Sequence, residues 1–221
     1  MMRFFHKQPF DYPDFWQDYE LSFNQKLPTD PNEVRFVVVD TETTGFDYEN
    51  DRILSLGALS LQNNNIVLSE SLELYIAQEY YDTESVKIHG ILKNSRNDQI
   101  GEAEAIQQLL AYLGNAVIIA HHAVFDLTMI NRAMERQGLP RLKNKVLDTS
   151  NLYRNTLITS NIFKKKEHYS LDELAEKFDI CKKDRHTAIG DAYITAIAFL
   201  KILPRLKAKR PLTLRDLIKL G

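Results

Sequence analysis

Two acidic residues, Asp40 and Glu42, stand two positions apart where a short apolar run, residues 34–39, ends. A β-branched run of this kind is typical of a buried strand, on which side chains at i and i+2 point to the same face. Two ionised carboxylates side by side repel each other, so the pair predicts a compensating cation. Mg²⁺ or Mn²⁺ fits best, because such hard ions prefer carboxylate oxygens and water. The alternative is a polar strand end followed by a threonine-rich turn.

Three further residues suited to this chemistry follow later in the chain. Asp126 ends the segment Ala-His-His-Ala-Val-Phe-Asp, where a predicted strand gives way to a helix, and His186 and Asp191 open a long predicted helix. Taken singly, Asp126 is also explained as a first-turn acid that the helix dipole favours, and His186 as a surface histidine. Together they indicate one site, because α/β folds gather functional residues at strand ends and helix starts.

The elements that position these residues follow an α/β order. Three strands come first, and strands then alternate with helices, which predicts a mixed sheet with helices on both faces. Strands are expected at 34–39, 52–61, 66–76, 116–120 and 146–147, and helices at 102–113, 124–137, from 171, at 187–203 and at 213–220.

On these motifs the sequence resembles the DEDDh 3′→5′ exonucleases, the DnaQ-like branch of the ribonuclease H-like superfamily. The resemblance covers residues 35–204. The first motif is matched by Asp40 and Glu42, the second by Asp126, and the third by His186 with Asp191. The resemblance implies a ribonuclease H-like mixed five-stranded sheet flanked by helices.

Further parts of the sequence also match this family, and one position departs from it. The spacing of His186 and Asp191 marks the histidine subclass, since the tyrosine subclass has tyrosine at the position of Thr187. His122 stands where the family usually has asparagine. The lesser matches are Ile88-His-Gly-Ile91, Val146-Leu-Asp-Thr149, with Asp148 read as structural, and Tyr169-Ser-Leu-Asp-Glu-Leu174.

The resemblance also implies a mechanism, hydrolysis with two divalent ions. Asp40 would contact both ions, Glu42 and Asp191 the first, and Asp126 the second. His186 would be the general base, since imidazole accepts protons near neutral pH. Nucleotides would leave the 3′ end as 5′-mononucleotides. The implied contacts to the terminal nucleotides are Thr41, Thr43, Phe46, His89 and Phe125; for Phe125, helix packing is an equal alternative.

Substrate and partners stay open at this level. We favour single-stranded DNA, with RNA 3′ ends as the alternative, because relatives with the same five residues act on both. A catalytically silent nucleic-acid-binding module is a further alternative, which the five intact positions argue against. The candidate protein partners are a DNA polymerase and a second copy of the chain. With a polymerase, the chain would be an epsilon-like proofreading subunit in replication or repair.

Composition and charge set the remaining expectations. Residues 1–140 carry 10 Lys+Arg against 21 Asp+Glu, and residues 141–221 carry 18 against 9, so a basic face for nucleic acid is expected. The basic segments 164–166 and 182–185 precede the third motif and are candidates to flank the backbone path. Cys181 is the one cysteine, and neither a signal peptide nor a membrane span is evident, so we expect a cytoplasmic protein.

Three regions are expected along the chain. Residues 1–33 form an aromatic N-terminal arm, residues 34–204 the exonuclease domain, and residues 205–221 a basic tail with a short helix. The arm holds eight of the chain's aromatics and is expected to pack on the domain or on a partner, since floppy tails are poor in aromatics.

Overall fold

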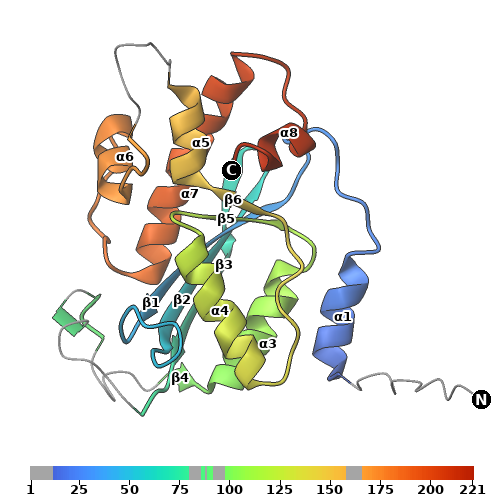
Figure 1. The fold of residues 1–221 in the computed structure, drawn as a ribbon, viewed down its shortest axis with the longest axis vertical. Coiled ribbons are helices and arrows are strands. Elements are labelled where there is room, and N and C mark those ends of the chain that lie inside the picture. The colour runs from blue at the N-terminus through green and yellow to red at the C-terminus, as the bar shows by residue number, and fades with distance from the viewer. Residues whose placement is uncertain (1–11, 80–85, 88, 92–97, 158–165) are drawn as a thin grey trace, which may run out of the picture.

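A central mixed sheet organises the computed structural model, which describes residues 12–79, 86–87, 89–91, 98–157 and 166–221. The strand order is β4-β3-β2-β1-β5-β6, with β1 antiparallel to β2 and parallel to β5 (Figure 1). The α/β class is confirmed, but the sheet formed by the described residues has six strands rather than five. The bounds are β1 Phe36–Thr43, β2 Ile53–Gln62, β3 Asn65–Ile76, β4 Gln99–Ile100, β5 Val117–Ala120 and β6 Val146–Asp148.

The additional strand, β4, pairs through only Gln99 and Ile100 with the end of β3. Two residues are too few to show the alternation by which a strand is recognised in a sequence. Strand β1 is longer than expected and continues to Thr43, so that Asp40 and Glu42 lie within the strand and not beyond it.

Helices cover both faces of the sheet (Figure 1). Each face has its own apolar core. Val37 and Val39 of β1 point into the core that contains α1, α3 and α4, whereas Phe36 and Val38 point into the core that contains α5, α6, α7 and α8. The helices are α1 Asp14–Ser22, α3 Glu102–Leu113, α4 Val124–Arg136, α5 Thr149–Thr156, α6 Leu171–Phe178, α7 Ala188–Lys207 and α8 Leu214–Ile218.

Three helical details differ from the sequence expectations. Helices α1 and α5 were not predicted, and α5 begins at the side chain of Asp148, which accepts hydrogen bonds from the amides of Ser150 and Asn151. Helix α7 continues past Pro204 to Lys207, although proline lacks the amide hydrogen that an internal position normally donates. No helix of the described residues is long and apolar enough to cross a membrane.

The described part of the N-terminal arm packs on the domain. Trp16 and Tyr19 of α1 are buried, and the Tyr19 hydroxyl donates to Asn144 Oδ1 at 2.5 Å. Burial raises the pKa of Tyr19 to about 12, so this hydroxyl keeps its proton. The other arm aromatics Phe4, Phe5 and Phe10 lie outside the described residues. The division of the chain into three regions stays a prediction.

The first turn of α7 lies directly on strand β2, and a glycine makes this approach feasible. Gly57 of β2 pairs with Asp40 of β1. A Cβ at Gly57 would lie 2.4 Å from both the carbonyl carbon of Ala188 and the amide nitrogen of Ile189. Because those are backbone atoms, any side chain at position 57 would push α7 away from the sheet beside Asp40.

We expect Gly57→Ala to lower the free energy of unfolding by about 1–3 kcal/mol, the usual cost of overpacking a tight contact. Urea denaturation measures the change. Gly101→Ala is the matched control, because a Cβ at this residue would meet no atom within 4 Å and its φ is −72°. Equal effects of the two substitutions would contradict the proposed steric role of Gly57.

Candidate metal and nucleic-acid site

Three of the predicted carboxylates converge beside this contact. Asp40 and Glu42 point from β1 toward the α7 side of the sheet, and Asp191 lies in the first turn of α7. One carboxylate oxygen from each residue lies within 4.8 Å of those of the other two. The sequence predicted this cluster, although Asp40 and Asp191 lie far apart along the chain.

The fourth carboxylate, Asp126, is anchored to the same strand from the opposite face. It is buried in the first turn of α4, and its Oδ1 accepts hydrogen bonds from the amide of Thr41 at 2.9 Å and from the Thr41 hydroxyl at 2.7 Å. Thr41, predicted as a substrate contact, is itself buried and directs both donors to Asp126. Its contact with substrate stays a prediction, whereas its contact with Asp126 fixes an acid beside the cluster.

Crowding and burial favour the protonated forms of these acids. Burial raises the pKa of Asp40 well above its ordinary range, and the charges of Asp126, Asp191 and Glu42 raise it further. Burial, together with Asp191 and Asp126, raises the pKa of Glu42 from 4.5 to about 7. Burial also raises the pKa of Asp126 to about 7, against the hydrogen bonds from Thr41. A bound cation would relieve all of these effects.

The donor set fits a divalent metal. All four side chains offer carboxylate oxygens, the ligands that Mg²⁺ and Mn²⁺ prefer. Asp191 Oδ1 is buried and has no hydrogen-bond partner among the described residues, which leaves it available as a ligand.

Arg185 is a residue of the site that the sequence did not reveal in this role. Its Nη1 forms a short ion pair with Asp191 Oδ2, and its Nε donates to Asp172 Oδ1 of α6 at 3.1 Å. The guanidinium therefore supplies part of the positive charge that the acids need. Lys182, from the same basic segment, pairs with Glu176 at 2.9 Å, while Lys164 and Lys165 lie outside the described residues. The expectation that these segments flank the nucleic acid is untested.

His186 lies at the exposed edge of the cluster, in the turn before α7. Its backbone is left-handed, with φ 65°, and the next residue, Thr187, caps the helix by accepting a hydrogen bond from the Gly190 amide at 3.1 Å. Burial raises the pKa of Asp191, while Arg185 and then His186 oppose that shift, so His186 is close enough to Asp191 to act on it electrostatically. The turn thus places an imidazole next to the acids.

The two histidines of the second motif have structural surroundings. His121 is buried with its Nδ1 2.8 Å from the Thr149 hydroxyl, and burial, assisted by His122, lowers the pKa of His121 to about 4. His122 has φ 58°, a conformation in which asparagine and histidine are both enriched. The departure from asparagine therefore preserves the backbone of this turn, which Asp148 also holds by accepting from the Ala123 amide at 2.9 Å.

An aromatic cluster lies beside the second motif. The ring centroids of Phe46 and Phe125 are 5.6 Å apart, and those of Tyr48 and Phe125 are 5.8 Å apart. Phe46 is 78% exposed, so it contributes little to the core. Phe46 and Phe125 were predicted from the sequence as substrate contacts, whereas Tyr48 was not, because a tyrosine in a polar loop shows no periodicity.

The two other predicted substrate contacts, Thr43 and His89, lie next to each other. Burial lowers the pKa of His89, and a backbone interaction with Thr43 partly opposes the shift. His89 Nδ1 accepts a hydrogen bond from the Ile91 amide at 3.0 Å, and the Thr43 hydroxyl donates to the Gly45 carbonyl at 2.7 Å. The structure brings both near the first motif without showing what they bind.

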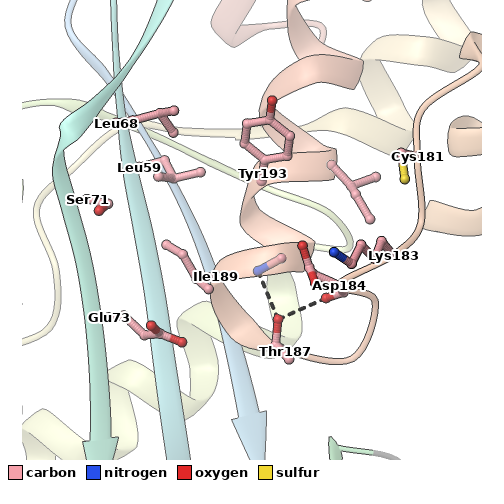
Figure 2. A pocket seen from close by; sticks show the side chains of 12 residues that line it. Leu59, Leu68, Ser71, Glu73, Cys181, Lys183, Asp184, Thr187, Ile189 and Tyr193 are labelled. Carbon is pink, nitrogen blue, oxygen red and sulfur yellow. Dashed lines mark hydrogen bonds between the residues drawn. The ribbon is translucent and has the colours of Figure 1, made fainter.

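A hollow of about 540 Å³ lies between the start of α7 and strands β2 and β3 (Figure 2). It is lined by Leu59, Leu68, Ile189 and Tyr193, and by polar residues that include Thr187, but by none of the four acids. The carboxylate cluster is therefore not part of this hollow.

Residues 37–199 of the chain match the exonuclease family RNase_T. The chain belongs to this exonuclease family. The match spans all three motifs, and the resemblance to DnaQ-like exonucleases is thereby confirmed.

Relatives of this exonuclease-family chain include DNA polymerase III proteins. It is 33% identical over 176 residues to DNA polymerase III PolC-type of Caldanaerobacter subterraneus, covering 79% of this chain but 12% of that protein. It is 29% identical over 172 residues to DNA polymerase III subunit epsilon of Aquifex aeolicus, covering 77% of this chain and 81% of that protein. The chain thus corresponds to a small part of the first relative and to most of the second.

The fold is that of solved exonucleases. The structure of E. coli Exonuclease I in complex with a dT13 oligonucleotide has a TM-score of 0.68 at 19% identity, covering 80% of this chain and 42% of that one. At this identity the likeness establishes the shared fold alone.

The raised carboxylate pKa values predict a metal-dependent change of stability with pH. A carboxyl such as Glu42, whose pKa in the folded protein is about 7 instead of 4.5, stabilises the fold below pH 4.5 and loses that contribution as the pH rises to about 7. In EDTA, the melting temperature should therefore fall between about pH 5 and pH 8, and Mg²⁺ or Mn²⁺ should restore it at about pH 8.

Calorimetry of the wild type and of Glu42→Gln measures this effect. The amide does not titrate, so the pH-dependent loss in EDTA should be smaller in the variant. Protonated carboxylates are poor ligands, so metal should raise the melting temperature less at about pH 5 than at about pH 8. An equal rise at these two pH values would contradict the interpretation.

Proposed function

We propose that the chain is a metal-dependent 3′→5′ exonuclease that releases 5′-mononucleotides from single-stranded DNA. The observation that carries this proposal is the convergence of Asp40, Glu42 and Asp191 oxygens within 4.8 Å, with Asp126 anchored beside them through Thr41. Membership of the exonuclease family and the intact histidine of the third motif support the same chemistry. The intact set argues against a silent binding module.

The residues divide the work of phosphodiester hydrolysis. Two divalent ions, when bound, supply an activated water and neutralise charge on the phosphate oxygens. Asp40, Glu42 and Asp191 would hold one ion, and Asp40 with Asp126 the other. His186, at the exposed edge, accepts the proton of the attacking water, a task suited to imidazole near neutral pH. Arg185 holds Asp191 in place from the side of α6.

The aromatic cluster favours a single-stranded substrate. Phe46, Tyr48 and Phe125 offer π-faces at the second motif, and unpaired bases stack on such rings in a sequence-tolerant way. The solved relative with this fold holds a dT13 oligonucleotide, which supports DNA over RNA as the substrate. The relatives' names favour a DNA polymerase as partner and a proofreading role. A cytoplasmic location fits Cys181, an exposed free thiol.

We expect Asp40→Ala and His186→Ala each to reduce nucleotide release by at least about 100-fold, since each removes a group that acts in the chemical step. Asp18→Ala, at an exposed acid of α1, is the control and should retain full activity. Product analysis uses 3′-labelled and 5′-labelled single-stranded DNA, duplex DNA and RNA with Mg²⁺ or Mn²⁺. Full activity of Asp40→Ala, or equal loss of label from 5′ ends, would refute the proposal.

A separate prediction concerns the aromatic cluster. Phe46→Ala should raise KM for single-stranded DNA roughly ten-fold, because loss of one base stack costs about 1–3 kcal/mol. Stability should not change, since the ring is 78% exposed. Leu21→Ala, at an exposed apolar residue of α1, is the control. An unchanged KM together with a lowered melting temperature would assign Phe46 to packing.

A further inference from the structure

The last 21 residues carry a strong positive charge that the catalytic site does not use. Residues 201–221 contain seven Lys and Arg but a single acid, Asp216. Six of the seven basic side chains belong to exposed residues, and we call these six the C-terminal basic surface: Lys201, Arg205, Lys209, Arg210, Arg215 and Lys219.

These charges are not neutralised within the described parts of the chain. None of the six forms an ion pair there. Arg205 lies over the Phe178 ring at 4.6 Å, and Lys209 Nζ donates to the Asn155 carbonyl at 2.9 Å. Thr213 caps α8, and the Asp216 carboxylate accepts hydrogen bonds from the Thr213 amide and hydroxyl. By contrast, Lys182 and Arg185 near the site are paired with acids.

The surface is continuous across the ends of several helices. Arg205 contacts the last residue of α6, and Lys209 contacts the end of α5. Hydrogen bonds with Thr213 lower the pKa of Asp216, and the charges of Arg210 and Lys219 lower it further, so both cations lie near α8. On a protein surface of mixed charge, the cations would form ion pairs with neighbouring acids.

The surface also lies away from the carboxylate cluster. Asp191 occupies the first turn of α7 and Arg205 the last, at opposite ends of that helix (Figure 1). At a rise of about 1.5 Å per residue, the helix between them is about 21 Å long. Phosphates recur about every 3.4 Å along one strand of a nucleic-acid helix, and an unstacked single strand is more extended, so at most roughly six nucleotides span this distance.

We propose that the C-terminal basic surface binds the phosphate backbone of the nucleic acid several nucleotides away from the 3′ end held at the carboxylates. This inference rests on the proposed function. It follows that only a strand long enough to reach from the cluster to this surface gains affinity from it. Phosphate contacts of this kind are independent of base sequence and weaken with salt.

The test compares strand lengths. The triple substitution Arg210→Gln, Arg215→Gln and Lys219→Gln should lower kcat/KM at least about ten-fold on a strand of about 24 nucleotides at low salt, and leave kcat/KM on a dinucleotide, which is too short to reach the surface, unaffected. The slope of log kcat/KM against log salt on the long strand should become shallower by about 2, since each lost contact contributes roughly 0.7.

A matched triple substitution separates position from net charge. Arg141→Gln, Lys143→Gln and Lys145→Gln also removes three exposed cations, but on the loop beside α1. The proposal is overturned if both triple variants lose kcat/KM equally, or if the C-terminal triple loses kcat/KM equally on both strand lengths. It is also overturned if the C-terminal triple loses no kcat/KM on the long strand, which is the result expected if an acidic protein occupies the surface.

Failure of the proposed function is distinguishable from failure of this inference. If the wild type hydrolyses no oligonucleotide, the exonuclease proposal fails. Binding of the long strand in EDTA, followed by fluorescence anisotropy, then still tests the surface. Weaker binding by the C-terminal triple than by the control triple supports it, and equal binding overturns it.

Discussion

The contact between the first turn of α7 and strand β2 is the constraint on which the site depends. It brings Asp191 against Asp40 and Glu42, and it exists because Gly57 has no side chain at the residue paired with Asp40. Burial, and after it the neighbouring carboxylates, raise the pKa values of Asp40 and Glu42, so keeping these acids ionised costs free energy that a bound cation would recover. The same geometry therefore makes the site both unfavourable when empty and selective for positive charge. Arg185 supplies part of that charge from the protein itself.

The alternation of strand β1 distributes the site over two cores. Asp40 and Glu42 continue the face of Phe36 and Val38, toward α7, whereas Thr41 continues the face of Val37 and Val39, toward α4. Each core therefore delivers one acid to the strand: α7 carries Asp191, and α4 carries Asp126. A shift of β1 by one residue would reverse both faces and move Asp40 and Glu42 to the α4 side of the sheet, away from Asp191. The buried valines that fix the register are thus as necessary to the site as the acids.

Features that depend on local patterns and motif spacing could be predicted from the sequence. Features that depend on contacts between residues far apart in the chain could not. The five longer strands, the α/β order and the family followed from apolar runs and from five residues in three motifs. The role of Arg185 could not be read, because its partners Asp172 and Asp191 are brought to it by the packing of α6 and α7. Tyr48 and the two-residue strand β4 lack periodicity. Gly57 did leave a signal, since glycine within an apolar strand often marks a close backbone approach.

The uneven charge of the chain affects how a site built from acids can bind a nucleic acid. The first 140 residues carry the net negative charge, and three of the four clustered acids belong to them. This negative charge repels the phosphates of a nucleic acid unless cations lie between them. Cations bound at the cluster act on only a few phosphates, because salt screens their charge beyond roughly 10 Å. Attraction for the rest of a long strand must then come from elsewhere on the protein. Arg205, which forms no ion pair among the described residues, lies about 21 Å along α7 from Asp191 and so beyond that screening length. The two fields therefore coexist on one chain without cancelling.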